Sequence, residues 1–154
     1  MTSAKAILDQ AAQRRDAGQL AYSGAVTPEE ALALVQTDPN VRIVDVRTMA
    51  ENDWVGRPNL LPSQYVCVEW LIYPGLTRNE RFLHQLAMRV TPEHRLLFLC
   101  RSAARSKAAA KAAFDAGYTQ SFDILEGFEG DKDADGHRKT VNGWCFRGLP
   151  WTGA

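Results

Sequence analysis

Hydrophobic positions along this chain alternate between two kinds of spacing. Apolar residues at positions 4, 7, 8, 11 and 12 follow helical spacing, as do those at 82, 83, 86, 87 and 90. Short, mostly apolar runs at 41–47, 65–68, 95–99 and 121–125 are typical of strands. An alanine-rich helix is expected over 104–116, ended by Gly117. The alternation predicts an α/β fold with a mostly parallel central sheet and helices on both faces.

Residues that typically end or start helices divide the N-terminal part of the chain. Gly18 is suited to ending the first helix, and Thr27-Pro28-Glu29-Glu30 has the composition of a helix start with a capping box. We therefore expect residues 1–22 to form a helical extension packed on the domain and residues 23–154 to form the domain itself. A chain of 154 residues is most simply one domain with a substantial core.

Composition excludes several classes of function. The 18 basic residues balance the 18 acidic ones, so neither a nucleic-acid partner nor a membrane surface is expected. Cys67, Cys100 and Cys145 are odd in number and far apart, which argues against a disulfide framework and fits a reducing compartment. No CxxC pair is present, so no metal site is expected. The N-terminus lacks the pattern of a secretory signal, and we expect a cytoplasmic protein.

The strongest chemical signal follows the apolar run at 95–99. This run ends at Cys100 and leads into a loop with the sequence Cys100-Arg101-Ser102-Ala103-Ala104-Arg105-Ser106, at the start of the alanine-rich helix. Backbone N–H groups, the helix dipole and nearby guanidinium groups all favour a thiolate in this position. The sequence therefore predicts a nucleophilic cysteine; the alternative is a buried structural thiol.

Other polar residues lie at the end of a neighbouring strand. Asp45 and Arg47 end the run at 41–47, and the carboxyl ends of parallel strands meet at one edge of a sheet. We expect both residues to support the framework of the site by closing loops. Arg105 either forms a structural ion pair, with Asp45 as the candidate partner, or binds substrate directly. Cys67 is expected in the core, with a resolving thiol as the alternative.

On these residues the chain resembles the single-domain rhodanese (thiosulfate sulfurtransferase-like) family. The similarity covers residues 24–151 and is carried by four features: Val44–Arg47 with Glu51 and Trp54-Val55-Gly56, the loop Cys100–Ser106, the segment Ile124-Leu125-Glu126-Gly127-Phe128, and Gly143-Trp144 with Gly148-Leu149-Pro150-Trp151. The resemblance implies a rhodanese-like fold. It also implies sulfane-sulfur transfer from a donor such as thiosulfate, through a persulfide on Cys100, to cyanide, a thiol or a protein cysteine.

The same resemblance implies roles for the loop residues. No cofactor is implied beyond the covalent persulfide on Cys100. The substrate-binding loop comprises Arg101, Ser102, Ala103, Ala104, Arg105 and Ser106. Its arginines can bind the donor's oxyanion or hold the loop, its serines can donate hydrogen bonds, and its backbone N–H groups can form an anion-binding nest. Ser106 can alternatively cap the helix.

The chain departs from the family pattern in the loop and at two other places. Many members have glycine at the position of Ala103; alanine is strained at positive φ, so we expect an ordinary helical conformation there. The family's histidine-isoleucine-proline-glycine stretch is replaced at 57–62, and 131–142 has the character of an insertion. The start of the 131–142 segment matches an EF-hand calcium loop, but Asn142 stands where such loops have glutamate. We therefore expect this segment to form a surface turn.

Two other functions compete with sulfur transfer. A cysteine phosphatase of this fold has a C-x5-R loop, whereas Cys100 to Arg105 is C-x4-R, the shorter sulfurtransferase form. A non-catalytic module that carries persulfide or acts as a sensor is the other alternative, which the alanine at position 103 keeps open.

Overall fold

A five-stranded parallel sheet forms the centre of the protein. The computed structural model describes residues 3–153, and its strands pair in the order β1-β8-β7-β2-β4. The bounds are β1 Gly24–Val26, β2 Val41–Asp45, β4 Tyr65–Cys67, β7 Arg95–Leu99 and β8 Ser121–Ile124. The predicted α/β fold with a parallel sheet is therefore confirmed.

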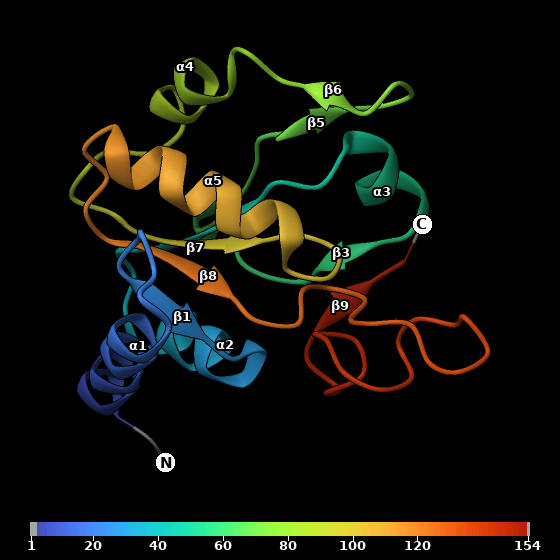
Figure 1. Cartoon of the computed structure of the whole chain (residues 1–154), viewed down its shortest axis with the longest axis horizontal. Helices are drawn as coiled ribbons and strands as arrows, with labels where there is room; N and C mark the ends of the chain where they lie inside the picture. The colour runs from blue at the N-terminus through green and yellow to red at the C-terminus, as the bar shows by residue number, and fades with distance from the viewer. Residues whose placement is uncertain (1–2, 154) are drawn as a thin grey trace.

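Helices cover both faces of the sheet (Figure 1). They are α1 Ala4–Gly18, α2 Pro28–Thr37, α3 Met49–Trp54, α4 Phe82–Ala87 and α5 Ala104–Asp115, with a 3-10 turn η1 at Pro62–Gln64. In the view of Figure 1, α4 and α5 lie above the sheet and α1 and α2 below it. The capping box at the start of α2 is present as predicted, with Thr27 and Glu30 bonded reciprocally.

Each face of the sheet has its own hydrophobic core. Side chains alternate between the faces along a strand, so Val44 and Phe98 pack with α4 and α5, while Ile43 and Leu97 pack with α1 and α2. All four are fully buried. This double coverage explains why the central strands are almost continuously apolar.

The N-terminal helix packs directly on the edge strand β1. Ile7 and Ala11 are buried, and a Cβ on Gly24 would lie 2.5 Å from the Ala11 carbonyl oxygen. Arg14 donates to the Ala25 carbonyl at 2.8 Å and to Glu30 at 2.6 Å. The division of the chain at residue 22 stays a prediction.

Two short antiparallel ribbons lie outside the main sheet. β3 Arg57–Pro58 pairs with β9 Trp151–Thr152, and β5 Leu71–Ile72 pairs with β6 Thr77–Arg78. The sequence did not predict these ribbons, whose strands have only two residues each, and it did not predict β1 or α3. Both ribbons lie at the side of the molecule where α5 begins (Figure 1).

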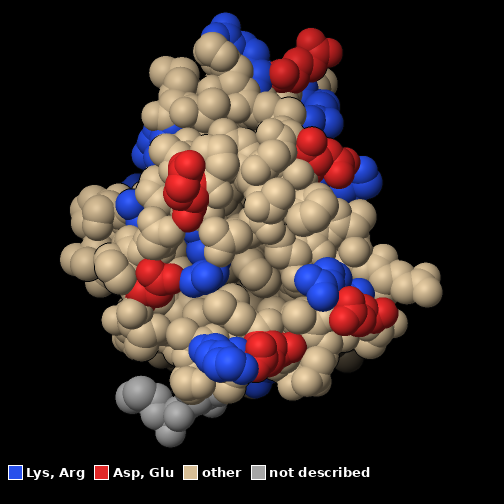
Figure 2. Space-filling view, turned by 90° about the vertical axis from the view of Figure 1, so that its left-hand side faces the viewer, with Lys and Arg blue, Asp and Glu red and all other residues tan. Residues whose placement is uncertain are grey.

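The surface carries acidic and basic groups close together. On the face shown in Figure 2, blue and red side chains occur in small neighbouring groups within a largely uncharged surface. Within residues 3–153, no helix is both long and apolar enough to cross a membrane.

Candidate active site

The carboxyl ends of the central strands bring the predicted residues to one edge of the sheet. Cys100 directly follows β7, and Asp45 is the last residue of β2 and lies beside Leu99 in the strand register. Cys67 ends β4 on the other side of β2. The structure therefore places Cys100 and Asp45 at the same edge, as parallel pairing requires.

Cys100 is the first residue of a tight loop that turns into α5. Its side chain is buried, at 1% exposure, and its Sγ lies 3.3 Å from the hydroxyl oxygen of Ser106. Ser106 stands inside the first turn of α5, so the expectation that it could cap this helix is wrong. Ala103 occupies the cap position, and alanine has no side-chain acceptor for the first N–H groups of the helix.

The conformation of Ala103 corrects a prediction. Its φ is 75°, in the left-handed region, where an ordinary helical conformation was expected. The loop must reverse direction between Cys100 and α5, and this closure overrides the local preference of alanine. The chain thus has the backbone shape that glycine would supply, at the cost of some strain.

The segment after β8 supports the loop from behind. The N–H of Phe128 donates to the Cys100 carbonyl at 2.7 Å, and that of Glu129 donates to the Arg101 carbonyl at 3.0 Å. Gly127 has a φ of 74°, and a Cβ there would collide with the Arg101 carbonyl. A glycine at position 127 is therefore needed for the loop to pack this closely.

Arg105 connects the loop to α3. Its two terminal nitrogens donate to the two carboxylate oxygens of Glu51 at 2.7 and 2.9 Å. Burial opposes ionisation of Glu51, but hydrogen bonds and charge from Arg105 lower its pKa to about 2. Asp45 was the predicted partner, and that prediction is wrong because Asp45 is paired with another arginine.

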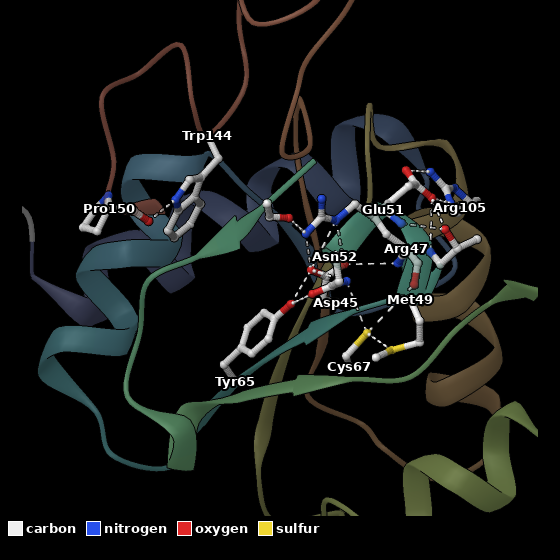
Figure 3. A network of polar contacts seen from close by, with 12 residues as sticks. Asp45, Arg47, Met49, Glu51, Asn52, Tyr65, Cys67, Arg105, Trp144 and Pro150 are labelled. Atoms are coloured by element: carbon white, nitrogen blue, oxygen red, sulfur yellow. Dashed lines mark hydrogen bonds and ion pairs between the residues drawn. The ribbon is translucent and has the colours of Figure 1, made fainter. Parts of the chain in front are cut away.

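Asp45 and Arg47 form a buried ion pair next to the loop (Figure 3). Both side chains are inaccessible to solvent, and Arg47 donates to Asp45 through its Nε at 3.0 Å and its Nη2 at 2.7 Å. The hydroxyl of Tyr65 donates to Asp45 at 2.6 Å. The side chain of Asn52 in α3 contacts both residues: its amide nitrogen donates to Asp45, and its amide oxygen accepts from the Tyr65 hydroxyl. Burial and the charge of Asp45 raise the pKa of Tyr65, which keeps its hydroxyl as a donor.

Arg47 also reaches the segments that close the site. Its Nη2 donates to the Gly56 carbonyl at 2.9 Å, and its guanidinium lies 4.2 Å from the centre of the Phe128 ring. The Trp144 indole N–H donates to the Pro150 carbonyl at 2.8 Å, which holds the C-terminal segment beside β3 (Figure 3). Asp45 and Arg47 therefore join the strand ends to the surrounding loops.

A second buried carboxyl lies behind Cys100. The Ser106 hydroxyl donates to Asp123 at 2.5 Å, so Cys100, Ser106 and Asp123 form a continuous polar chain. Burial raises the pKa of Asp123 to about 7, although the Ser106 hydrogen bond and Lys107 oppose this. Sequence reasoning missed Asp123; the available signal was an acidic residue inside an apolar strand.

The remaining cysteines are less suited to nucleophilic chemistry. Burial and the charge of Asp45 raise the pKa of Cys67 to about 12, and burial raises that of Cys145 to about 11. The Cys67 sulfur lies among polar and sulfur groups, 3.4 Å from Asn52 and 3.5 Å from Met49. Cys67 is half-buried, so the expectation that it lies in the core is only partly correct.

Part of the loop borders an open cavity of about 550 Å³. Arg101 is exposed and lines this cavity together with Arg105. Ser102 is half-buried, and Ala104 begins α5 with its side chain exposed. Trp54, Tyr73 and Leu76, which the sequence did not predict as site residues, also line this cavity.

The segment 131–142 forms a hydrogen-bonded surface turn. Both oxygens of Asp133 are occupied: one accepts from the N–H groups of Asp135 and His137, and the other accepts from the hydroxyl of Thr140. Across residues 3–153, His, Cys, Asp and Glu side chains do not gather in threes that could hold a metal ion.

Three comparisons place this geometry among known proteins. No family model matches the sequence. The uncharacterized protein RP600 of Rickettsia prowazekii is 32% identical over 114 residues, which are 73% of this chain and 83% of that protein. The crystal structure of Rv0390 from M. tuberculosis is 42% identical, with a TM-score of 0.78, and covers 86% of this chain and 99% of its own.

A more distant structure shares the fold. The polysulfide-sulfur transferase homodimer of Wolinella succinogenes has a TM-score of 0.60 at 22% identity, covering 93% of each chain. The parallel sheet of this chain agrees with the fold of these two structures. The chain belongs to the single-domain rhodanese-like family.

Proposed function

We propose that this protein is a sulfurtransferase of the thiosulfate:cyanide type. It moves a sulfane sulfur from a donor such as thiosulfate to a thiophilic acceptor through a persulfide on Cys100. The observation that carries this proposal is the position of Cys100 at the start of a C-x4-R loop, which leads into the N-terminus of α5, where no side chain caps the helix. Free N–H groups at a helix N-terminus stabilise a thiolate and a persulfide anion.

The reaction consists of two displacements on sulfur. The Cys100 thiolate attacks the outer sulfur of thiosulfate, the S–S bond of the donor breaks, and sulfite leaves with the bonding electrons. An acceptor nucleophile such as cyanide then attacks the terminal sulfur of the persulfide, and Cys100 departs as a thiolate. No net oxidation or reduction of the enzyme occurs, so the cycle needs no cofactor.

The neighbouring residues support this cycle in different ways. Arg101 is accessible at the cavity and supplies positive charge for an anionic donor. Arg105 is held by Glu51 and fixes the end of the loop. Asp45 and Arg47 fix the strand ends behind it. Acceptors compatible with the chemistry are cyanide, a small thiol and a protein cysteine.

Steady-state kinetics test the proposal. With thiosulfate and cyanide varied together, thiocyanate formation should follow a ping-pong pattern. The Cys100→Ser variant should be inactive, while Cys67→Ser and Cys145→Ser, the matched controls, should retain activity. Turnover by Cys100→Ser, or its loss in a control variant that folds normally, would overturn the assignment of Cys100.

A further inference from the structure

A chain of polar groups runs from Cys100 into the core of the protein, beyond the atoms that react with the donor. The Cys100 thiol donates to the Ser106 hydroxyl oxygen at 3.3 Å, and the Ser106 hydroxyl donates to the Asp123 carboxylate at 2.5 Å. All three residues are buried, although they come from the loop, from α5 and from β8. The fold therefore aligns a thiol, a hydroxyl and a carboxyl away from solvent.

Asp123 lies in an apolar part of the core. In the parallel register it stands opposite Phe98 of β7 and Ala25 of β1, which are both buried. Among residues 3–153, its second oxygen, Oδ2, has no hydrogen-bond partner. An ionised carboxylate with a single donor is strongly destabilised in such surroundings, whereas the protonated form has no net charge. Burial accordingly raises the pKa of Asp123 to about 7.

Lys107 and Tyr22 are titratable neighbours of Asp123. Lys107, on α5, favours the ionised carboxylate, but its own side chain is exposed to solvent. Tyr22, two residues before β1, stays neutral near neutral pH, because burial and the charge of Asp123 raise its pKa to about 12. In the described part of the chain, neither residue hydrogen-bonds to Asp123. Ser106 is therefore the route by which Asp123 can exchange a proton.

Arg105 and Glu51 act on the thiol end of the polar chain. Arg105 lies close enough to interact with the charge of Cys100, and it forms its ion pair with Glu51 at 2.7 Å. Burial opposes the ionisation of Glu51, but Arg105 lowers its pKa to about 2. Neither residue of this pair changes its charge near neutral pH. The pH dependence of Cys100 in this range therefore comes from its own thiol and from Asp123.

We propose that Asp123 is a positioning residue for the nucleophile and shares one proton with Cys100 through the Ser106 hydroxyl. The S–H bond of Cys100 breaks as its proton moves to the Ser106 oxygen, and the original Ser106 proton moves to Asp123. The products are a thiolate, an intact hydroxyl and a neutral carboxylic acid, so the total charge does not change. Ser106 then donates to the thiolate and stabilises it. This proposal rests on the proposed sulfurtransferase function, since it assigns how the nucleophile of that reaction ionises.

Titration by heteronuclear NMR follows both ends of the polar chain. The resonances of Asp123 Cγ and Cys100 Cβ each change with the protonation of their own side chain. In the wild type both resonances should show the same two midpoints, because strongly interacting groups titrate as a pair. Two independent curves, each with a single midpoint of its own, would overturn the proposal.

Variants test whether Asp123 and Ser106 control the charge of Cys100. Asp123→Asn cannot ionise, so Cys100 should titrate in one step, at least roughly one pH unit below its upper wild-type midpoint, because carboxylate–thiolate repulsion is gone. Ser106→Ala removes the donor to the thiolate and should raise the midpoint of Cys100. Asp115→Asn, at an exposed position on α5, is the matched control and should leave both curves unchanged. An unchanged Cys100 curve in Asp123→Asn would also overturn the proposal.

Single-turnover kinetics separate this proposal from the sulfurtransferase proposal. The rate of sulfur transfer from thiosulfate to Cys100 should follow the thiolate fraction, so the pH profile of Asp123→Asn should shift by as much as its NMR midpoint. A lower rate with an unmoved profile would assign Asp123 a merely structural role and overturn the shared proton. If the two residues titrate as a pair but no sulfane donor loads Cys100, the sulfurtransferase proposal fails and the shared proton stands.

Discussion

Arg105 donates hydrogen bonds from both terminal nitrogens to both carboxylate oxygens of Glu51, at 2.7 and 2.9 Å. This paired contact fastens the end of the Cys100 loop to the first turn of α3, and both side chains are largely buried. Arg101, four residues earlier in the same loop, is exposed. We therefore propose different roles for the two arginines of the loop: Arg105 holds the shape of the loop, and Arg101 contacts the substrate.

Replacing Arg105 should lower stability as well as activity. Arg105→Ala leaves the carboxylate of Glu51 partly buried without its partner, which costs about 1–3 kcal/mol of unfolding free energy. Arg105→Lys keeps the charge but loses the paired geometry, so it should recover only part of that loss. Chemical denaturation at pH 7 measures both variants. Wild-type stability in Arg105→Ala would show that the contact with Glu51 does not hold the loop.

Replacing Arg101 should lower activity and leave stability almost unchanged. Arg101→Ala removes an exposed charge, so the free energy of unfolding should stay within about 0.5 kcal/mol of the wild type. The kcat/KM for thiosulfate should fall roughly tenfold or more, because a charge-assisted contact contributes about 1.5–3 kcal/mol. A neutral persulfide donor serves as the control. An equal loss with the neutral and anionic donors would contradict the role of Arg101 in binding an anion.

Asp123 should make stability depend on pH in an unusual direction. Its pKa is about 7 in the folded protein, against an ordinary value of 3.8, so the native state keeps a proton that the unfolded chain releases. The contribution of Asp123 to the free energy of unfolding is therefore full below pH 4. It is lost as pH rises toward 7, by up to about 1.4 kcal/mol per pH unit. Asp123→Asn cannot ionise, so its free energy of unfolding should fall less between pH 5 and 7.

Urea denaturation at several pH values measures this difference. Glu51 has its low pKa near 2, so it titrates below the window and does not obscure the comparison. Identical slopes for the wild type and Asp123→Asn between pH 5 and 7 would mean that Asp123 is ionised throughout the window.

The strained residue in the loop offers a stabilising substitution. Ala103 has a φ of 75°, which glycine adopts without a steric penalty. Ala103→Gly should raise the free energy of unfolding by up to about 1 kcal/mol, since the relief of strain exceeds the added freedom of the unfolded chain. Thermal unfolding checks this result. A lower melting temperature would show that contacts of the buried methyl group outweigh the strain.

The sequence predicted those parts of the fold that have a clear run or spacing of apolar residues. β7 has the predicted bounds, Arg95–Leu99, and α5 begins at Ala104 as expected. Other ends shifted where tertiary contacts decide them: β2 ends at Asp45 because Arg47 turns back to bond its carboxylate. The ribbons formed by β3, β5, β6 and β9 depend on contacts between distant segments and leave no local pattern.

The candidate site was predictable in its cysteine and only partly in its surroundings. Cys100 stands out because a buried strand, a loop and a helix meet at it. The partner of Arg105 was not predictable, because Asp45 and Glu51 are both acidic residues near the end of the same strand. Only the fold shows that Asp45 forms its ion pair with Arg47, which leaves Glu51 as the partner of Arg105. Ala103 was mispredicted because loop closure outweighed the intrinsic preference of the residue.

The formation of a persulfide on Cys100 tests the central claim most directly. Intact-mass spectrometry after incubation with thiosulfate should show one added sulfur on the wild type, on Cys67→Ser and on Cys145→Ser, and none on Cys100→Ser. Cyanide should then remove the sulfur and release thiocyanate. An adduct that persists in Cys100→Ser, or a wild type that gains no sulfur from any sulfane donor, would contradict the account.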